Sequence, residues 1–224
     1  MSDAHRAGGG GGRIVVVTST EVDTPHGPAR VHLDACGDPR AALVLGHGAG
    51  GRVDSPDLAA VAEAARTLGV RVALVEQPYR VAGRRSPAPA GQLDTAWTAV
   101  IDHLRAGALA GLPLIAGGRS SGARVACRTA AATGALAVLC VAFPLQPPRR
   151  AGSGASASRL PELERVPVPT LVVQGTRDPF GIPPAGARRM VVTVEGNHGF
   201  RMDLGAVSAA VSAWLTGLLE TPAR

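Results

Sequence analysis

The stretch Gly118-Arg119-Ser120-Ser121-Gly122 decides the fold. It follows an apolar run and precedes an alanine-rich segment, so the sequence predicts a strand, a tight turn and a helix in that order. Centring the motif on Ser121 would put Arg119 and Ala123 at the glycine positions, where side chains would clash within the turn. Ser120 is therefore predicted to be a nucleophile at the carboxyl end of a strand, near the positive end of a helix dipole. The alternative is a plain strand–turn–helix junction, because glycine-rich chains produce this motif by chance.

A serine hydroxyl is a weak nucleophile, so the chain should also carry a base and an acid that orients it. The only histidine downstream of Ser120 is His198, which follows the last apolar run. The best acid candidate is Asp178, directly after another apolar run; Asp203 is a weaker rival because it fits a helix cap. Ser, Asp, His is the chain order of α/β-hydrolases. In isolation, Asp178 could instead cap the turn that Pro179 begins, and His198 could be a solvated loop residue.

Apolar runs alternate with helical patterns along the chain, which is typical of a mainly parallel sheet covered by helices on both faces. One helix is expected to begin with Ser55 as its N-cap and Pro56 as its first residue and to run to about Leu68. Other helices are expected over 92–105, 121–132 and 203–219. Residues 78–91 and 146–160 are predicted to be irregular, and neither segment holds a second domain or a large lid. The sequence thus predicts one α/β-hydrolase domain over 13–224 with about seven to eight strands. The strand candidates are residues 14–18, 29–34, 41–46, 70–76, 113–117, 135–143, 170–175 and 190–195.

The glycine-rich loop Gly46-His47-Gly48-Ala49-Gly50-Gly51 follows the third predicted strand, where this fold places an oxyanion donor. We expect the backbone amides of Ala49 and Ser121 to be the two donors. The loop also matches the dinucleotide-binding pattern G-x-G-x-x-G, with Glu76 ending the next strand. That alternative is disfavoured, because Ser55-Pro56 starts the helix four residues after Gly51 and because it leaves the serine, acid and histidine unexplained.

Composition excludes several other classes of protein. The net charge is +6, but all 23 basic residues are arginine and no basic recognition helix is visible, so we expect no nucleic-acid partner. No apolar stretch approaches the roughly 20 residues that span a bilayer. Residues 1–12 end in a glycine run and are expected to be a disordered leader. The three cysteines are expected to be reduced core thiols of a cytoplasmic monomer or homodimer, with neither metal nor cofactor.

Several motifs together resemble one known family. The chain resembles the small α/β-hydrolase-like family that includes bacterial predicted hydrolases and a subunit of the NSL histone acetyltransferase complex; dienelactone-hydrolase-like enzymes are more distant relatives. The resemblance spans about 43–219 and implies that Ser120, Asp178 and His198 are nucleophile, acid and base. Dienelactone hydrolases usually carry cysteine as nucleophile, so Ser120 favours ester or thioester chemistry. The motifs are HGAGG at 47–51, GRSSG at 118–122, FPL at 143–145 followed by Pro147-Pro148, QGTRDPFG at 174–181 and GNHGF at 196–200.

The sequence therefore predicts a serine hydrolase that transfers an acyl group from a small-molecule substrate to water. The alternative is a catalytically silent scaffold or interaction protein of the same fold. Arginines near the site, above all Arg119, are expected to give a slight preference for anionic substrates. The residues expected to contact the substrate are His47, Gly48, Tyr79, Arg119, Phe143 and Phe180.

Overall fold

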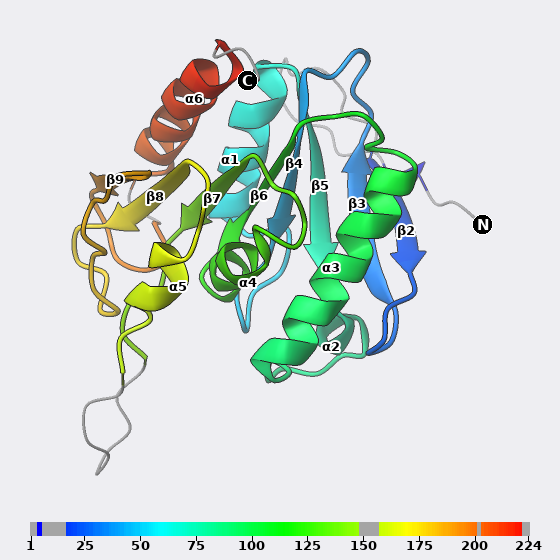
Figure 1. Cartoon of the computed structure of the whole chain (residues 1–224), viewed down its shortest axis with the longest axis horizontal. Coiled ribbons are helices and arrows are strands. Elements are labelled where there is room, and N and C mark those ends of the chain that lie inside the picture. The colour runs from blue at the N-terminus through cyan, green and yellow to red at the C-terminus, as the bar shows by residue number, and fades with distance from the viewer. Residues whose placement is uncertain (1–3, 6–16, 148–156, 201–202, 221–224) are drawn as a thin grey trace.

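The computed structural model describes residues 4–5, 17–147, 157–200 and 203–220. Within these residues one nine-stranded sheet runs through the molecule in the order β1-β2-β3-β5-β4-β6-β7-β8-β9 (Figure 1). The first strands pair antiparallel up to the β3–β5 pair, and every later pair is parallel. The strands are β1 (Ala4–His5), β2 (Val17–Val22), β3 (Ala29–Asp34), β4 (Ala41–Gly46), β5 (Val70–Glu76), β6 (Leu114–Arg119), β7 (Ala137–Val141), β8 (Thr170–Gly175) and β9 (Arg189–Val194).

Helices cover both faces of the sheet. One face packs against α3 (Ala90–Ala106), α4 (Ser121–Thr129) and the short α2 (Pro78–Val81) and α5 (Leu160–Glu164), and the other packs against α1 (Pro56–Thr67) and α6 (Leu204–Glu220). Because the central strands are enclosed on both sides, β4, β7 and β8 are buried along their whole length. The predicted fold class is confirmed. Within the described ranges, no helix combines the length and the apolar character needed to cross a membrane.

The structure differs from the sequence-based element boundaries in a few places. β1 lies inside the segment expected to be a disordered leader and adds one strand to the predicted sheet. The first predicted strand begins before the described residues, and β2 continues to Val22. The single-turn helix α2 lies in the segment 78–91 that is predicted to be irregular, since Pro78 begins a helical turn, and α5 starts at Leu160, the last residue of the other such segment. Residues 148–156 of the second segment lie outside the described residues.

Two predicted helix caps have different outcomes. The Asp203 carboxylate accepts a hydrogen bond from the Ala206 amide (2.8 Å), as a cap of α6 does. The Ser55 hydroxyl does not cap α1 but donates to the Asp57 carboxylate (2.6 Å). Asp203 therefore serves a helix end, whereas Asp57 is drawn into a buried network at the start of α1.

Candidate active site

The turn at Ser120 has the geometry that the glycine motif predicts. Ser120 adopts φ 53° and ψ −106°, a conformation that side chains rarely adopt, between the end of β6 and the first residue of α4. Its amide donates to the Val141 carbonyl (2.9 Å), which fixes the strained turn against β7. A Cβ on Gly118 would lie 2.5 Å from the Gly46 carbonyl oxygen, and one on Gly122 would collide with the same atom. The two glycines are thus required by the close approach of β4.

The structure brings Ser120, His198 and Asp178 together in one chain of hydrogen bonds. His198 Nε2 lies 3.0 Å from Ser120 Oγ, and His198 Nδ1 lies 2.8 Å from Asp178 Oδ2. The Asp178 side chain is fully buried and that of His198 is 17% exposed. Because an ionised carboxylate only accepts, Nδ1 carries the proton and Nε2 is free to accept the serine proton. Each residue follows a different strand (β6, β8 or β9), and the carboxyl ends of these parallel strands meet at one edge of the sheet.

Gln174, which the sequence shows only as the first residue of the QGTRDPFG motif, supports the Asp178 carboxylate. Its buried Nε2 lies 2.8 Å from Asp178 Oδ2, the same oxygen that faces His198, and 3.0 Å from the Gly181 carbonyl. The Phe180 amide donates to the other carboxylate oxygen of Asp178 (2.9 Å). Three donors therefore hold this carboxylate, and they leave little freedom for the acid to rotate away from His198. The signal in the sequence was a glutamine at the end of an apolar strand, four residues before the acid.

The loop that carries His198 is anchored to the core by Phe200. The Phe200 side chain is completely buried in the core on the face of the sheet covered by α1 and α6, although its φ is 49°. Its amide donates to the Asn197 carbonyl, and its own carbonyl accepts from the Asp203 amide that begins α6. A bulky residue persists in this backbone region only where its surroundings over-determine it, so burial of the ring holds the histidine loop in place.

The glycine-rich loop after β4 lies against Ser120. A Cβ on Gly48 would lie 3.6 Å from Ser120 Cβ, so the loop and the serine are immediate neighbours. The amides of Ala49 and Ser121 have no hydrogen-bond partner within the described part of the chain. The Tyr79 hydroxyl donates to the Ala49 carbonyl (2.7 Å), and burial raises the pKa of Tyr79 to about 12. Tyr79 therefore stays a hydrogen-bond donor that orients the Ala49 peptide.

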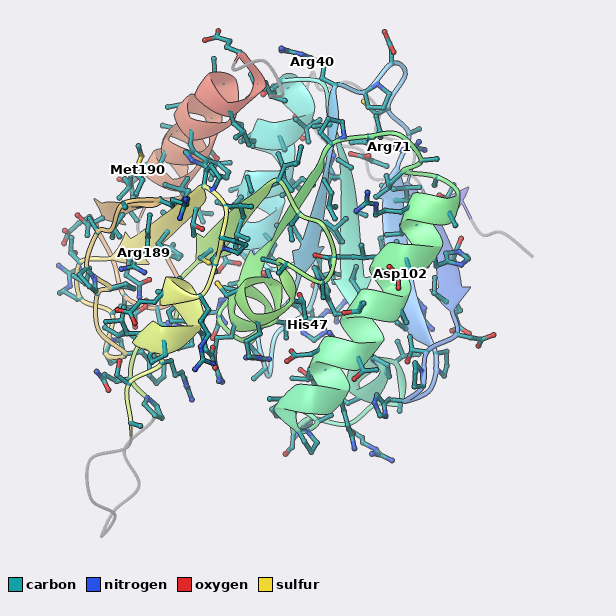
Figure 2. The ribbon with its side chains drawn as sticks, in the orientation of Figure 1. Arg40, His47, Arg71, Asp102, Arg189 and Met190 are labelled. Atoms are coloured by element: carbon teal, nitrogen blue, oxygen red, sulfur yellow. The ribbon has the colours of Figure 1, made fainter. Side chains whose placement is uncertain are left out.

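His47 is a buried residue that supports the same loop. Its Nδ1–H donates to the Gly48 carbonyl (2.8 Å), and its Nε2 accepts from the Gln77 amide (3.1 Å), which fixes the neutral tautomer. The ring packs edge-on against Tyr79. Figure 2 labels His47 below the ends of the central strands, on the edge of the sheet where the site forms. Desolvation by burial lowers the pKa of His47 below its ordinary value of 6.5.

The lowered pKa of His47 predicts a pH-dependent stability. At a pH well above 6.5 the imidazole is neutral in both the folded and the unfolded chain. As the pH falls below 6.5 the unfolded chain takes up the proton first, so the free energy of unfolding decreases. Protonation of the folded state would also place an N–H against the Gln77 amide. Urea unfolding at pH 7.5 and 5.5 should show a larger loss for the wild type than for His47→Gln. Replacing the exposed His26 with glutamine is the control, and an equal pH dependence in His47→Gln and wild type would contradict the prediction.

The structure corrects several predicted substrate contacts. Phe143 is fully buried in the core, because Ala142 has φ 52° and reverses the chain after β7. Gly48 and Tyr79 are also buried, so they support the site from behind. Arg119 is partly buried, and its guanidinium donates hydrogen bonds to protein groups. Phe180 is the predicted contact that remains available: it is partly exposed, and its ring lies 4.6 Å from the His198 ring, edge to face.

The acidic, histidine and cysteine side chains are distributed over the described part of the chain without a metal-type cluster. Among them, no group of three or more His, Cys, Asp or Glu side chains is arranged as a metal site. The Cys127 and Cys140 thiols touch each other (3.4 Å) inside the core, and Cys36 is unpaired.

Comparisons with known proteins agree with this architecture. The family model for an alpha/beta hydrolase domain matches residues 39–203. A serine hydrolase without a lid from Xanthomonas campestris has 20% identity and a TM-score of 0.70, covering 92% of this chain and 97% of its own. Est1E from Butyrivibrio proteoclasticus has 16% identity and a TM-score of 0.74, covering 91% and 99%. A dienelactone hydrolase from Anabaena variabilis has 19% identity and a TM-score of 0.70, covering 91% and 98%.

No match was found among curated proteins. The family model nevertheless spans most of the chain, and the matched residues include Ser120, Asp178 and His198. The chain therefore belongs to the alpha/beta hydrolase domain family.

Proposed function

We propose that the protein is a serine hydrolase that cleaves a carboxylic ester or thioester of a small-molecule substrate. The observation that carries this proposal is the continuous hydrogen-bond chain from Ser120 Oγ through His198 to the buried carboxylate of Asp178. All three groups lie within hydrogen-bond distance of their partners, which is the geometric condition for general-base activation of a serine.

The first half of the reaction acylates the serine. His198 Nε2 takes the proton from Ser120 Oγ as the oxygen attacks the substrate carbonyl, and Asp178 stabilises the resulting imidazolium. The negative charge that develops on the carbonyl oxygen is bound by the amides of Ala49 and Ser121. Ser121 is the first residue of α4, where the amide groups are free and the helix dipole favours negative charge. Collapse of the tetrahedral intermediate expels the alcohol or thiol, which takes its proton from His198.

The second half returns the enzyme to its starting state. A water molecule gives its proton to His198 and attacks the acyl-Ser120 carbonyl. The second tetrahedral intermediate then releases the carboxylic acid and restores the serine hydroxyl. We also propose that this chain is a relative of the small α/β-hydrolase-like family that its sequence motifs resemble. Dienelactone hydrolases usually carry cysteine as nucleophile, so Ser120 favours ester or thioester hydrolysis over the dienelactone reaction.

Covalent labelling tests this function directly. A fluorophosphonate probe should form a stable adduct with the wild-type protein at Ser120, identified by mass spectrometry of the labelled peptide. The same protein should hydrolyse p-nitrophenyl and thioester substrates over a range of acyl chain lengths. A feruloyl ester belongs in the panel because Est1E has been solved with ferulic acid bound. Absence of labelling and of turnover across the panel would instead support a catalytically silent scaffold.

A further inference from the structure

Arg119 joins three separate parts of the site. Its Nε donates to Asp57 Oδ2 at the start of α1 (3.1 Å), and its Nη2 donates to the backbone carbonyl of His198 (3.0 Å). Its Nη1 lies against the glycine-rich loop, since a Cβ on Gly48 would be only 2.7 Å away. The residue itself immediately precedes Ser120. One guanidinium therefore contacts the loops of the base and of the oxyanion donors while its backbone is joined to the nucleophile.

Asp57 is a fixed point for this guanidinium. Its side chain is 4% exposed, and its Oδ1 accepts from the Ser55 hydroxyl (2.6 Å) and the Leu58 amide (2.9 Å). The carboxylate lies in the first turn of α1, where the helix dipole favours a negative charge. These hydrogen bonds hold the Asp57 carboxylate in one orientation. The salt bridge to this fixed carboxylate therefore sets the orientation of the Arg119 guanidinium.

The two hydrogen bonds need the shape of arginine. Nε and Nη2 lie on one edge of the planar guanidinium, and here that edge is divided between a carboxylate and a peptide carbonyl. A lysine ammonium is a single point charge on a flexible chain, so it preserves the charge opposite Asp57 but not the two directed contacts. The His198 carbonyl belongs to the same residue as the catalytic imidazole, so its displacement moves Nε2 relative to Ser120 Oγ.

We infer that Arg119 is a positioning residue, which uses Asp57 as an anchor to hold the His198 loop at the distance that places Nε2 against Ser120 Oγ. The inference rests on the proposed function, because it assigns Arg119 a role in presenting the base and none in binding the substrate. It also explains why an arginine beside the nucleophile has only 21% of its side chain exposed.

The test compares Arg119→Lys with a matched control, Arg66→Lys. Arg66 Nε donates to the buried Asp34 (2.9 Å), with side-chain exposures of 23% and 2% that resemble those of the Arg119–Asp57 pair. Asp34 lies at the opposite end of the sheet, where its carbonyl accepts from Arg71, which Figure 2 labels far from His47. Both substitutions weaken a similar ion pair and should lower the melting temperature similarly. Only Arg119 contacts the His198 loop, whereas Arg66 does not.

We expect Arg119→Lys to lower kcat on an activated ester by about 10-fold to 100-fold, since a displacement on the order of 1 Å has an effect of this size. KM should stay within about twofold, because no substrate contact is lost. The rate of fluorophosphonate labelling should fall by the same factor as kcat. Arg66→Lys should keep wild-type values for all three quantities. Asp57→Asn removes the anchor charge and should also lower kcat, which provides a second test if Arg119→Lys folds poorly.

Wild-type kcat in Arg119→Lys, or an equal loss in Arg66→Lys, would overturn the inference and leave the proposed function intact. A wild-type protein that neither labels nor hydrolyses the panel would overturn the proposed function. The inference would then be judged by crystal structures of wild type and Arg119→Lys. An unchanged separation of His198 Nε2 and Ser120 Oγ in the variant overturns it, and a lengthened separation supports it.

Discussion

Ser120→Ala is expected to lower kcat for ester hydrolysis by about 10⁶-fold, to the level of the residual activity of a hydrolase that has lost its serine. The substitution removes the hydroxyl oxygen that lies 3.0 Å from His198 Nε2, so no acyl-enzyme can form at residue 120. Alanine tolerates the strained φ of 53° no worse than serine does, so the fold should survive. The measurement is steady-state hydrolysis of an activated ester together with the far-UV circular dichroism spectrum of the variant.

Ser208→Ala is the control for this experiment. Ser208 lies on α6, where its hydroxyl donates to the Ala60 carbonyl on the far side of the sheet from α4. Its loss should leave turnover and labelling unchanged. Substantial ester hydrolysis by Ser120→Ala would show that the activity does not depend on the proposed nucleophile.

Asp178→Asn has the second largest expected effect, a decrease in kcat of about 10⁴-fold. With the Phe180 amide paired to the side-chain oxygen, the asparagine NH₂ group replaces Oδ2 and faces His198 Nδ1. It would then donate to Nδ1 and move the imidazole proton to Nε2, where it blocks acceptance of the serine proton. The same NH₂ group would also oppose the Gln174 amide, so some stability should be lost.

The matched control is Asp203→Asn, since Asp203 is the rival acid in the sequence. Its carboxylate caps α6, and asparagine is nearly as good a cap as aspartate. We expect Asp203→Asn to retain wild-type kcat and nearly the wild-type melting temperature. If Asp203→Asn lost activity and Asp178→Asn did not, the two assignments would have to be exchanged.

The parts of the site that the sequence predicts are those with local or ordered signals. The nucleophile turn is defined within five residues, because Gly118 and Gly122 meet the same β4 carbonyl. His198 and Asp178 are identified because each follows an apolar strand and the chain order leaves few other candidates. In a parallel sheet the ends of such strands meet at one edge, so position along the chain is enough to bring the three residues together.

The supporting residues could not be predicted because their partners are distant in the sequence. Arg119 and Asp57 are 62 positions apart, and nothing near either of them indicates which carboxylate meets which guanidinium. Phe143 illustrates the opposite error: a large apolar residue after a strand was expected to line the site, but the backbone reversal at Ala142 directs it into the core. Side-chain direction at strand ends depends on single backbone angles that composition does not encode.

Trp97 is a natural fluorescence reporter next to the candidate active site. Its ring is completely buried against the turn, where a Cβ on Gly46 would lie 3.3 Å from Trp97 Cζ3. Its indole N–H has no hydrogen-bond partner within the described residues. The chain has two tryptophans, and the other, Trp214, lies on α6 across the sheet. Trp214→Phe therefore leaves Trp97 as the single tryptophan, buried beside the turn that carries Ser120. The ultraviolet fluorescence of Trp97 should change when Ser120 is acylated or when the turn opens locally, without any added dye.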